Sequence, residues 1–396
     1  MFERPYLQIL KKRLNESRGF IQVVVGPRQV GKTTMISQLV KQLPFETLFV
    51  TADDVPAADR TWIKNSWSEA RRKLFNSEKK EFLLVIDEIQ KIDHWSETVK
   101  KEWDTDTLEG RNLKVVILGS SRLLIQKGLT ESLAGRFESI YLTHWNYAEM
   151  KEAFGWSVNQ YIWFGGYPGS VRLLEDESRW KAYIRDSLIE TSLSKDVLML
   201  TRVDKPALLR RLFEIGCIYS SQIVALHKIQ GELQEKGNLT TLSNYLNLLK
   251  EAGLITGIEK YAGDILRKRS SRPKFQVFNN ALMSAQTDVH YPQILSDHKE
   301  WGRMVESAVG VHLLNASLDK KFNLYYWNEN NHEVDFVIEK NGKLIGIEVK
   351  SGKDSQNQGM ALFEKAYDPH HIFIVGTDGI PFEEFLASDP STLFTI

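Results

Sequence analysis

Residues 21–34 limit the possible folds of this chain more than any other stretch. Ile21-Gln22-Val23-Val24-Val25 has the apolar character of a buried strand, and it leads directly into a loop framed by two glycines. That loop matches the phosphate-binding pattern Gly-x4-Gly-Lys-[Ser/Thr]. An amphipathic helix pattern follows it, which makes a chance match less frequent than the loop alone would allow. The loop reads Gly26-Pro27-Arg28-Gln29-Val30-Gly31-Lys32-Thr33, followed by Thr34.

Each position of the loop has an expected role at a nucleotide. The backbone N–H groups would surround the β-phosphate, and the N-terminus of the following helix adds a favourable dipole. Gly26 and Gly31 lie where the backbone must take unusual angles and approach the phosphate closely. We expect Lys32 to reach the β- and γ-phosphate oxygens and the Thr33 hydroxyl to hold Mg²⁺. Residues 26–34 are therefore the predicted ATP-binding segment.

Further apolar strands at 46–50, 82–86 and 115–118 alternate with helical patterns, including one at 6–18 and one at 62–75. This alternation predicts an α/β domain with a doubly wound parallel sheet that is covered on both faces. In such sheets the chemistry lies at the carboxyl ends of the strands. Several polar residues directly follow predicted strands here, which places them at one edge of the sheet.

Asp87 and Glu88 follow one of these strands. Asp87 is the expected second holder of Mg²⁺, and Glu88 is expected to orient or deprotonate the attacking water. Ser120 or Ser121, at the end of the next strand, is a candidate sensor of the γ-phosphate. The alternative for all four is a solvated strand end. Arg136 is a candidate arginine finger for a neighbouring subunit, and the alternative is a surface salt bridge.

In their order along the chain, these motifs resemble those of a prokaryotic AAA-type ATPase family. The resemblance implies a P-loop ATPase that uses ATP and Mg²⁺, works as a homo-oligomer and carries a C-terminal region of largely unassigned function. The motifs are residues 26–34, Asp87-Glu88-Ile89-Gln90-Lys91, Leu118-Gly119-Ser120-Ser121, Leu133-Ala134-Gly135-Arg136 and Phe164-Gly165-Gly166-Tyr167-Pro168.

Composition excludes several other classes. The formal net charge is +0, so nucleic acid or a membrane surface could be bound only through local patches. The single cysteine, Cys217, excludes an internal disulfide and a cysteine-rich zinc module, and its apolar neighbours favour a buried position. No apolar run reaches the roughly 18 residues of a membrane span, and the N-terminus lacks the apolar core of a signal peptide. We expect a cytoplasmic protein.

Residues 206–262 have the pattern of a winged helix, with amphipathic helices near 207–217, within 221–236 and at 242–252, then a strand. The third helix would expose Ser243, Asn244, Asn247 and Lys250 to a DNA major groove. A basic run follows, in which the predicted DNA contacts are Arg267, Lys268, Arg269, Arg272 and Lys274. The alternatives are a solvated hairpin tip or a module that docks protein.

The last part of the chain carries a second set of acidic residues. Strands at 333–338 and 343–350 flank the turn Asn341-Gly342, which predicts a hairpin. Strand alternation places Glu348 and Lys350 on one face, with Asp335 across the hairpin. This set resembles the Asp…Glu-x-Lys core of restriction-endonuclease-like nucleases, with Glu306 as the helix acid, and the resemblance implies an Mg²⁺ site. A degenerate nuclease that only grips nucleic acid and a solvated hairpin face are the alternatives.

Together these patterns predict four segments: an AAA-type core at 1–155, a helical lid or linker at 156–205, a winged helix at 206–280 and a restriction-endonuclease-like domain at 281–396. The predicted function is an Mg²⁺-dependent ATPase that performs conformational work on DNA, with a C-terminal domain that binds or cleaves DNA. A nucleotide-gated regulatory switch and a protein-binding scaffold are the alternatives.

Overall fold

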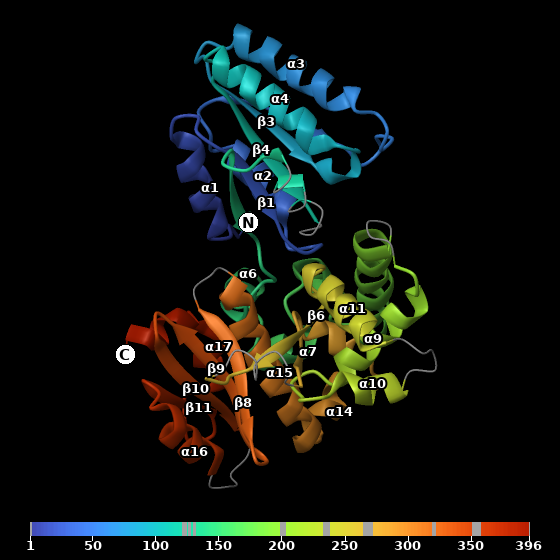
Figure 1. Ribbon diagram of the computed structural model, residues 1–396, viewed down its shortest axis with the longest axis vertical. Coiled ribbons are helices and arrows are strands. Elements are labelled where there is room, and N and C mark those ends of the chain that lie inside the picture. Colours follow the sequence, from blue (N-terminus) through green and yellow to red (C-terminus); the bar gives the residue numbers. More distant parts are fainter. Residues whose placement is uncertain are drawn as a thin grey trace. The chain divides into compact units, whose positions relative to one another are not determined.

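The computed structural model describes residues 2–120, 125, 128–129, 132–198, 203–232, 238–263, 272–318, 322–350 and 358–395 (Figure 1). These residues form two compact units. The first ends at Leu142 and the second begins at Thr143. In the part of the chain that is described, no helix is both long enough and apolar enough to cross a membrane.

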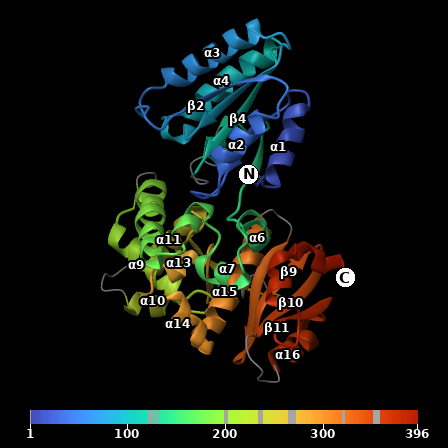
Figure 2. The ribbon, with the colours of Figure 1, turned by 180° about the vertical axis from the view of Figure 1, so that it is seen from behind.

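The first unit is built on a sheet of five parallel strands in the spatial order β2-β3-β4-β1-β5. Figure 2 labels two of these strands, β2 and β4. The predicted α/β class with a parallel sheet is therefore confirmed. The strands are β1 (Ile21–Val25), β2 (Glu46–Thr51), β3 (Phe82–Asp87), β4 (Leu113–Gly119) and β5 (Phe137–Tyr141).

Helices cover both faces of this sheet, which explains why the central strands β1, β3 and β4 are buried along their whole length and are mostly apolar. Val24 of β1 packs in one cluster with α1 and α2, whereas Val23 and Val25 pack in a second cluster with α3 and α4. Successive residues of β1 therefore enter opposite layers of the core. The helices are α1 (Tyr6–Asn15), α2 (Lys32–Val40), α3 (Thr61–Asn76) and α4 (Trp95–Leu108), and a short turn, η1 (Ile89–Lys91), follows β3.

The second unit begins with helical segments. The side chains of Asn146 and Ser157 cap the first two through reciprocal bonds with Glu149 and Gln160. After α7 the backbone N–H of Gly166 donates to Asn279 Oδ1 at 3.1 Å, which ties the glycine-rich motif to a distant part of this unit. The segments are α6 (Tyr147–Phe154), α7 (Val158–Phe164), η2 (Pro168–Leu173), α8 (Glu177–Ala182), η3 (Tyr183–Ile189) and η4 (Ser192–Leu198).

Three helices and a strand pair follow: α9 (Pro206–Ile218), α10 (Leu226–Glu232), α11 (Leu239–Glu251), β6 (Ile255–Lys260) and β7 (Lys274–Val277). The side chain of Asn238 caps α11, which buries its apolar stripe of Leu242, Tyr245, Leu246 and Leu249. β6 and β7 are antiparallel, and Ile223 forms an isolated bridge with Lys274 on the other side of β7.

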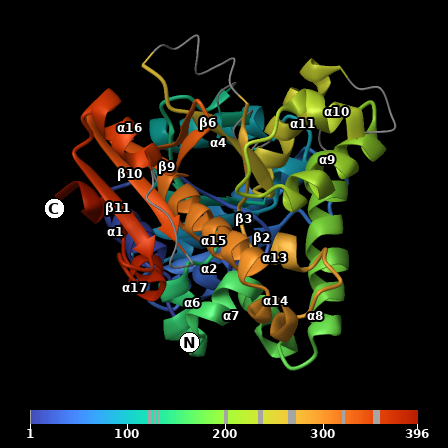
Figure 3. The same ribbon diagram turned by 90° about the horizontal axis from the view of Figure 1, so that it is seen from below.

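The remaining elements complete a six-stranded mixed sheet in the order β11-β10-β9-β8-β6-β7. β9 and β10 form the predicted hairpin, and β6 pairs in parallel with β8. The boundary that we predicted at residue 280 thus runs between strands of one sheet. Helix α15 packs against β8 and β10 (Figure 3). The elements are α13 (Ala281–Ser284), α14 (Tyr291–Ser296), α15 (His298–Leu318), β8 (Asn323–Glu329), β9 (His332–Lys340), β10 (Lys343–Lys350), α16 (Gln358–Tyr367), β11 (His371–Gly376), α17 (Phe382–Ala387) and η5 (Pro390–Thr395).

Candidate active site

The loop between β1 and α2 has the backbone geometry that its glycines predict. A Cβ atom on Gly26 would lie 2.3 Å from the carbonyl oxygen of Leu142, so no larger residue fits there without a backbone shift. Gly31 has φ 90°, a conformation that disfavours side chains, and it immediately precedes α2. The Lys32 ammonium is buried and donates to the carbonyl oxygens of Gly26 at 2.8 Å and Pro27 at 2.9 Å. Lys32 therefore lies within the loop, as expected for a phosphate-binding lysine.

The two residues that we predicted as Mg²⁺ holders lie side by side. Thr33, on the first turn of α2, donates its hydroxyl proton to Asp87 Oδ2 at 3.2 Å. Asp87 ends β3, and burial raises the pKa of its carboxyl, while the Thr33 bond and the Lys32 charge oppose that rise. A hydroxyl oxygen and a carboxylate are ligands that Mg²⁺ prefers, so this pair fits the ion.

Glu88 is held in a fixed position beside Asp87. Its backbone adopts φ 52°, a left-handed conformation that turns the chain sharply at the end of β3. Glu88 Oε2 accepts one hydrogen bond from Gln90 Nε2 at 2.6 Å and another from Ser120 Oγ at 3.1 Å. Burial raises the pKa of the Glu88 carboxyl, and the positive charges of Lys32 and Arg28 limit that rise. A general base works best with a pKa nearer the working pH, so the raised pKa suits this role.

Ser120 and Gln90 both donate to Glu88, but only Ser120 was predicted to have a role in the site. Ser120 lies against the carboxylate of Glu88, whereas Ser121 lies outside the described residues. We did not single out Gln90 by role, although it lies two residues after Glu88 in the quoted motif. Its position could have suggested the contact, because a tight turn directly after a strand brings the side chain of Gln90 back toward that of Glu88.

Arg136 forms an ion pair within the first unit. Its Nε and Nη2 atoms donate to the two carboxylate oxygens of Asp104 on α4, at 2.7 and 3.1 Å. This is the surface salt bridge that we gave as the alternative. A finger role stays a prediction, and it would require the guanidinium to exchange Asp104 for a phosphate group.

The second unit brings together the acids that we predicted from the C-terminal sequence. The backbone N–H of Val349 donates to Asp335 Oδ2 at 2.8 Å, which places Asp335 across the hairpin from the end of β10. Burial, reinforced by the charge of Asp335, raises the pKa of Glu348 to about 8. Burial likewise raises the pKa of Glu306 to about 7, although the charge of Lys274 opposes the rise. Glu306 and Asp335 both contact the Lys274 ammonium, and Glu348 lies on β10, the strand that Asp335 bonds; the nuclease role of this set stays a prediction.

The structure corrects the role that we gave Lys274. We predicted a DNA contact, but this side chain is fully buried. Its ammonium lies 2.7 Å from Glu306 Oε1, 3.1 Å from Glu333 Oε1 and 3.6 Å from Asp335 Oδ1. A buried ammonium enclosed by carboxylates cannot also contact the backbone of DNA. Sequence reasoning missed this contact and Glu333 because Lys274 follows a basic run and was grouped with it.

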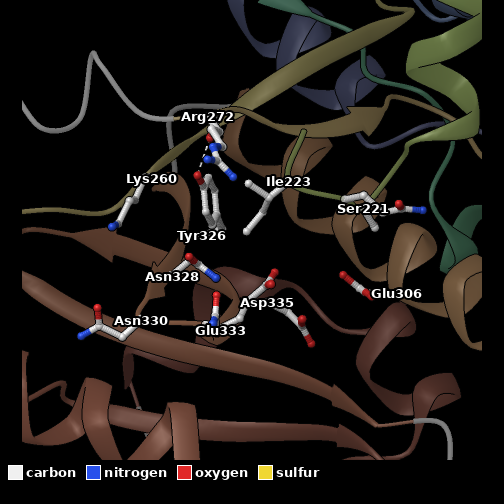
Figure 4. A pocket seen from close by; sticks show the side chains of 12 residues that line it. Ser221, Ile223, Lys260, Arg272, Glu306, Tyr326, Asn328, Asn330, Glu333 and Asp335 are labelled. Atoms are coloured by element: carbon white, nitrogen blue, oxygen red, sulfur yellow. Dashed lines mark hydrogen bonds between the residues drawn. The ribbon is translucent and has the colours of Figure 1, made fainter. Parts of the chain in front are cut away.

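A polar pocket of about 770 Å³ opens beside this cluster. Glu306, Glu333 and Asp335 line one part of it, and Lys260 and Arg272 line another (Figure 4). Arg272, a predicted DNA contact, is exposed, and its backbone oxygen accepts the hydroxyl proton of Tyr326. Arg267, Lys268 and Arg269 lie outside the described residues. Lys350 lies at the end of β10, two residues beyond Glu348.

Comparisons with known proteins agree with the fold of the first unit. Residues 18–151 match the family described as AAA domain, and residues 155–293 and 301–384 match two families described as domains of unknown function. The uncharacterized protein MJ1544 of Methanocaldococcus jannaschii is 24% identical over 95% of this chain and 86% of its own length. The uncharacterized protein Rv2008c of Mycobacterium tuberculosis is 27% identical over 84% of this chain and 70% of its own length.

Among solved structures, the Walker-type ATPase paby2304 of Pyrococcus abyssi aligns with a TM-score of 0.50 and 14% identity. The alignment covers 72% of this chain and 96% of that one. At this identity the likeness concerns the fold alone. The order of the parallel strands, the glycine-framed loop before α2 and the acids that follow β3 point to the same fold as the family match. Residues 18–151 therefore match the AAA domain family, and the first unit has the fold of P-loop ATPases.

Proposed function

We propose that this protein hydrolyses ATP in an Mg²⁺-dependent reaction at the loop of residues 26–34. The observation that carries this proposal is the cluster of Lys32, Thr33, Asp87 and Glu88 at one edge of the parallel sheet. Lys32 and Thr33 follow β1, whereas Asp87 and Glu88 lie at the end of β3, so the cluster comes from two separate places in the sequence. Their convergence is what phosphoryl transfer requires, because that reaction depends on positioning and charge stabilisation.

Each residue of the cluster would have its own role in ATP hydrolysis. Lys32 would exchange its bonds to the loop carbonyls for the β- and γ-phosphate oxygens. Thr33 and Asp87 would hold Mg²⁺, which neutralises phosphate charge when it is bound. Glu88, held by Gln90 and Ser120, would orient the attacking water and accept its proton.

Replacing Lys32 with alanine tests the binding step. The variant should lose Mg-ATP affinity and turnover together, since it removes a charge aimed at the phosphates. The control is Lys12→Ala, which removes an exposed lysine from α1 and should leave both unchanged. Wild-type ATP affinity and turnover in Lys32→Ala would exclude the loop as the site.

We further propose that the second unit contacts DNA. Helix α9, the Ile223 bridge, α10, α11 and the β6–β7 pair follow one another in the order of a winged helix. Helix α11 buries one face and exposes Ser243, Asn244, Asn247 and Lys250, as a recognition helix would. The basic run before β7 would contact phosphates, and ATP hydrolysis, in a homo-oligomer, would drive the conformational work on DNA.

DNA binding is tested with Lys250→Glu and Arg272→Glu, each of which reverses an exposed charge. We expect weaker duplex binding and a slope of log affinity against log salt that is shallower by about 1 to 2 per variant. Lys12→Glu makes the same charge change on α1 and should bind normally. Unchanged affinity in both test variants would favour a protein-binding scaffold. DNA binding without any effect on ATP turnover would favour a nucleotide-gated switch.

A further inference from the structure

The buried ammonium of Lys274 has a complete set of hydrogen-bond acceptors. It forms an ion pair with Glu306 Oε1 at 2.7 Å and donates to Glu333 Oε1 and to the backbone oxygen of Asp335, both at 3.1 Å. An ammonium has three N–H donors, and these three acceptors match that number. The charge also lies 4.7 Å from the centre of the Phe336 ring. Lys274 is therefore a fixed part of the cluster and has no donor left over for a ligand.

The acids that surround Lys274 come from separate elements of the second unit. Glu306 lies on α15, and Glu333 and Asp335 lie on β9, whereas Lys274 is the first residue of β7. One cation thus joins the β6–β7 pair to both the long helix and the hairpin of the mixed sheet. The three acids are partly buried, and carboxylates that are partly removed from water and crowded together repel one another, so a positive charge in this place stabilises the cluster.

A divalent metal ion does not fit this arrangement. Mg²⁺ requires carboxylate oxygens at about 2.0–2.1 Å around one centre, but here the Lys274 ammonium lies between the side chains of Glu306 and Asp335. A second cation at that place would meet the lysine charge directly. Among the described residues, no three His, Cys, Asp or Glu side chains are placed to hold one metal ion. The residues therefore disagree with the Mg²⁺ site that the nuclease resemblance implies.

We propose that Lys274 is the resident cation of this acidic cluster and replaces the metal ion there. The cluster acts as a charge clamp between the β6–β7 pair, α15 and β9. The second unit does not cleave phosphodiester bonds by a metal-dependent route, and any contact with nucleic acid is binding only. This inference does not depend on ATP hydrolysis, because it concerns the second unit alone.

Metal binding by the full chain tests the proposal without changing Lys274. The Asp87→Asn background removes the carboxylate that would hold metal in the first unit. Manganese is titrated at pH 7.5 without nucleotide, and bound Mn²⁺ is read by electron paramagnetic resonance. We expect that adding Asp335→Asn leaves the amount of bound Mn²⁺ unchanged. We also expect no Mn²⁺-dependent cleavage of duplex or branched DNA. One Mn²⁺ per chain that Asp335→Asn removes would overturn the proposal.

A rescue experiment tests the clamp. Lys274→Met should lower the melting temperature, because it leaves three partly buried, closely spaced acids without their cation. Adding Glu306→Gln and Asp335→Asn should restore most of the loss, since the unpaired charges then disappear. Lys260→Met, at the same pocket, provides a lysine control and should need no such rescue. If Lys274→Met does not fold, a folded triple variant supports the clamp. A triple variant that is no more stable than Lys274→Met contradicts it.

Discussion

Gln90→Ala should slow ATP turnover without weakening ATP binding. Gln90 lies on the short turn after β3, and its Nε2 atom donates to Glu88 Oε2 at 2.6 Å. The side chain is buried and donates to the proposed base, so we expect its effect on catalysis to act through Glu88. Removing it leaves Ser120 as the remaining described donor to that oxygen. The Glu88 carboxylate should then adopt its working orientation less often.

The size of the effect follows from this bond. A hydrogen bond to a charged group contributes about 1.5–3 kcal/mol. If the whole of that energy is expressed in the transition state, kcat falls about 10- to 100-fold, since 1.4 kcal/mol is tenfold. Loss of a donor to the carboxylate also raises the pKa of Glu88 further. The acidic limb of the kcat profile should therefore move to higher pH, because Glu88 must be ionised to accept a proton.

The assay measures kcat and KM for Mg-ATP from pH 5 to 9 in the wild type, in Gln90→Ala and in Gln8→Ala. Gln8 is an exposed glutamine on α1 and serves as the matched control. A purely structural role would lower the active fraction without moving the pH limb. Unchanged kcat and an unchanged limb in a folded Gln90→Ala variant would refute the reasoning.

Two other predictions concern stability. Asp106, fully buried, accepts from Trp67 Nε1 and Arg71 Nε, both at 2.7 Å, so Asp106→Asn should destabilise the first unit by about 3 kcal/mol in urea unfolding. If Asp106→Asn unfolds at the same urea concentration as the wild type, the hydrogen bonds of Asp106 contribute little to the stability of the first unit. In the second unit, the raised pKa of Glu348 means that the folded state binds its proton more tightly than the unfolded state. This tighter proton binding contributes to the free energy of unfolding. The contribution is fully present below about pH 4.5 and is lost as the pH rises through about 8. Glu348→Gln should therefore flatten the fall in melting temperature between pH 6 and 9, and the exposed control Glu329→Gln should not; equal slopes in all three proteins would contradict the shift.

The features of the first unit that sequence could predict are local ones. The loop of residues 26–34 specifies its own strand, turn and helix, and Asp87 and Glu88 follow an apolar strand whose carboxyl end must lie at the same sheet edge. The parallel sheet could be inferred because its apolar strands alternate with helical patterns. These inferences need only periodicity and turn chemistry, which act over a few residues.

Contacts between distant residues could not be predicted in the same way. The pairing of Lys274 with Glu306 and Asp335 depends on β6 lying parallel to β8, which no local pattern specifies. Basic neighbours made Lys274 resemble a surface residue, although the finished sheet buries it. Arg136 likewise meets Asp104 only once β5 and α4 are in place. Such contacts are set by tertiary packing of the whole unit.

The most direct test of the account compares ATP binding with ATP turnover in Glu88→Gln. This substitution keeps the shape of the side chain but removes the carboxylate that would accept the proton of water. Mg-ATP should bind with an affinity close to that of the wild type, because Lys32, Thr33 and Asp87 are intact. Turnover should fall by about 100-fold or more, in line with the loss of a general base. Turnover at the wild-type rate in Glu88→Gln would contradict the proposed active site.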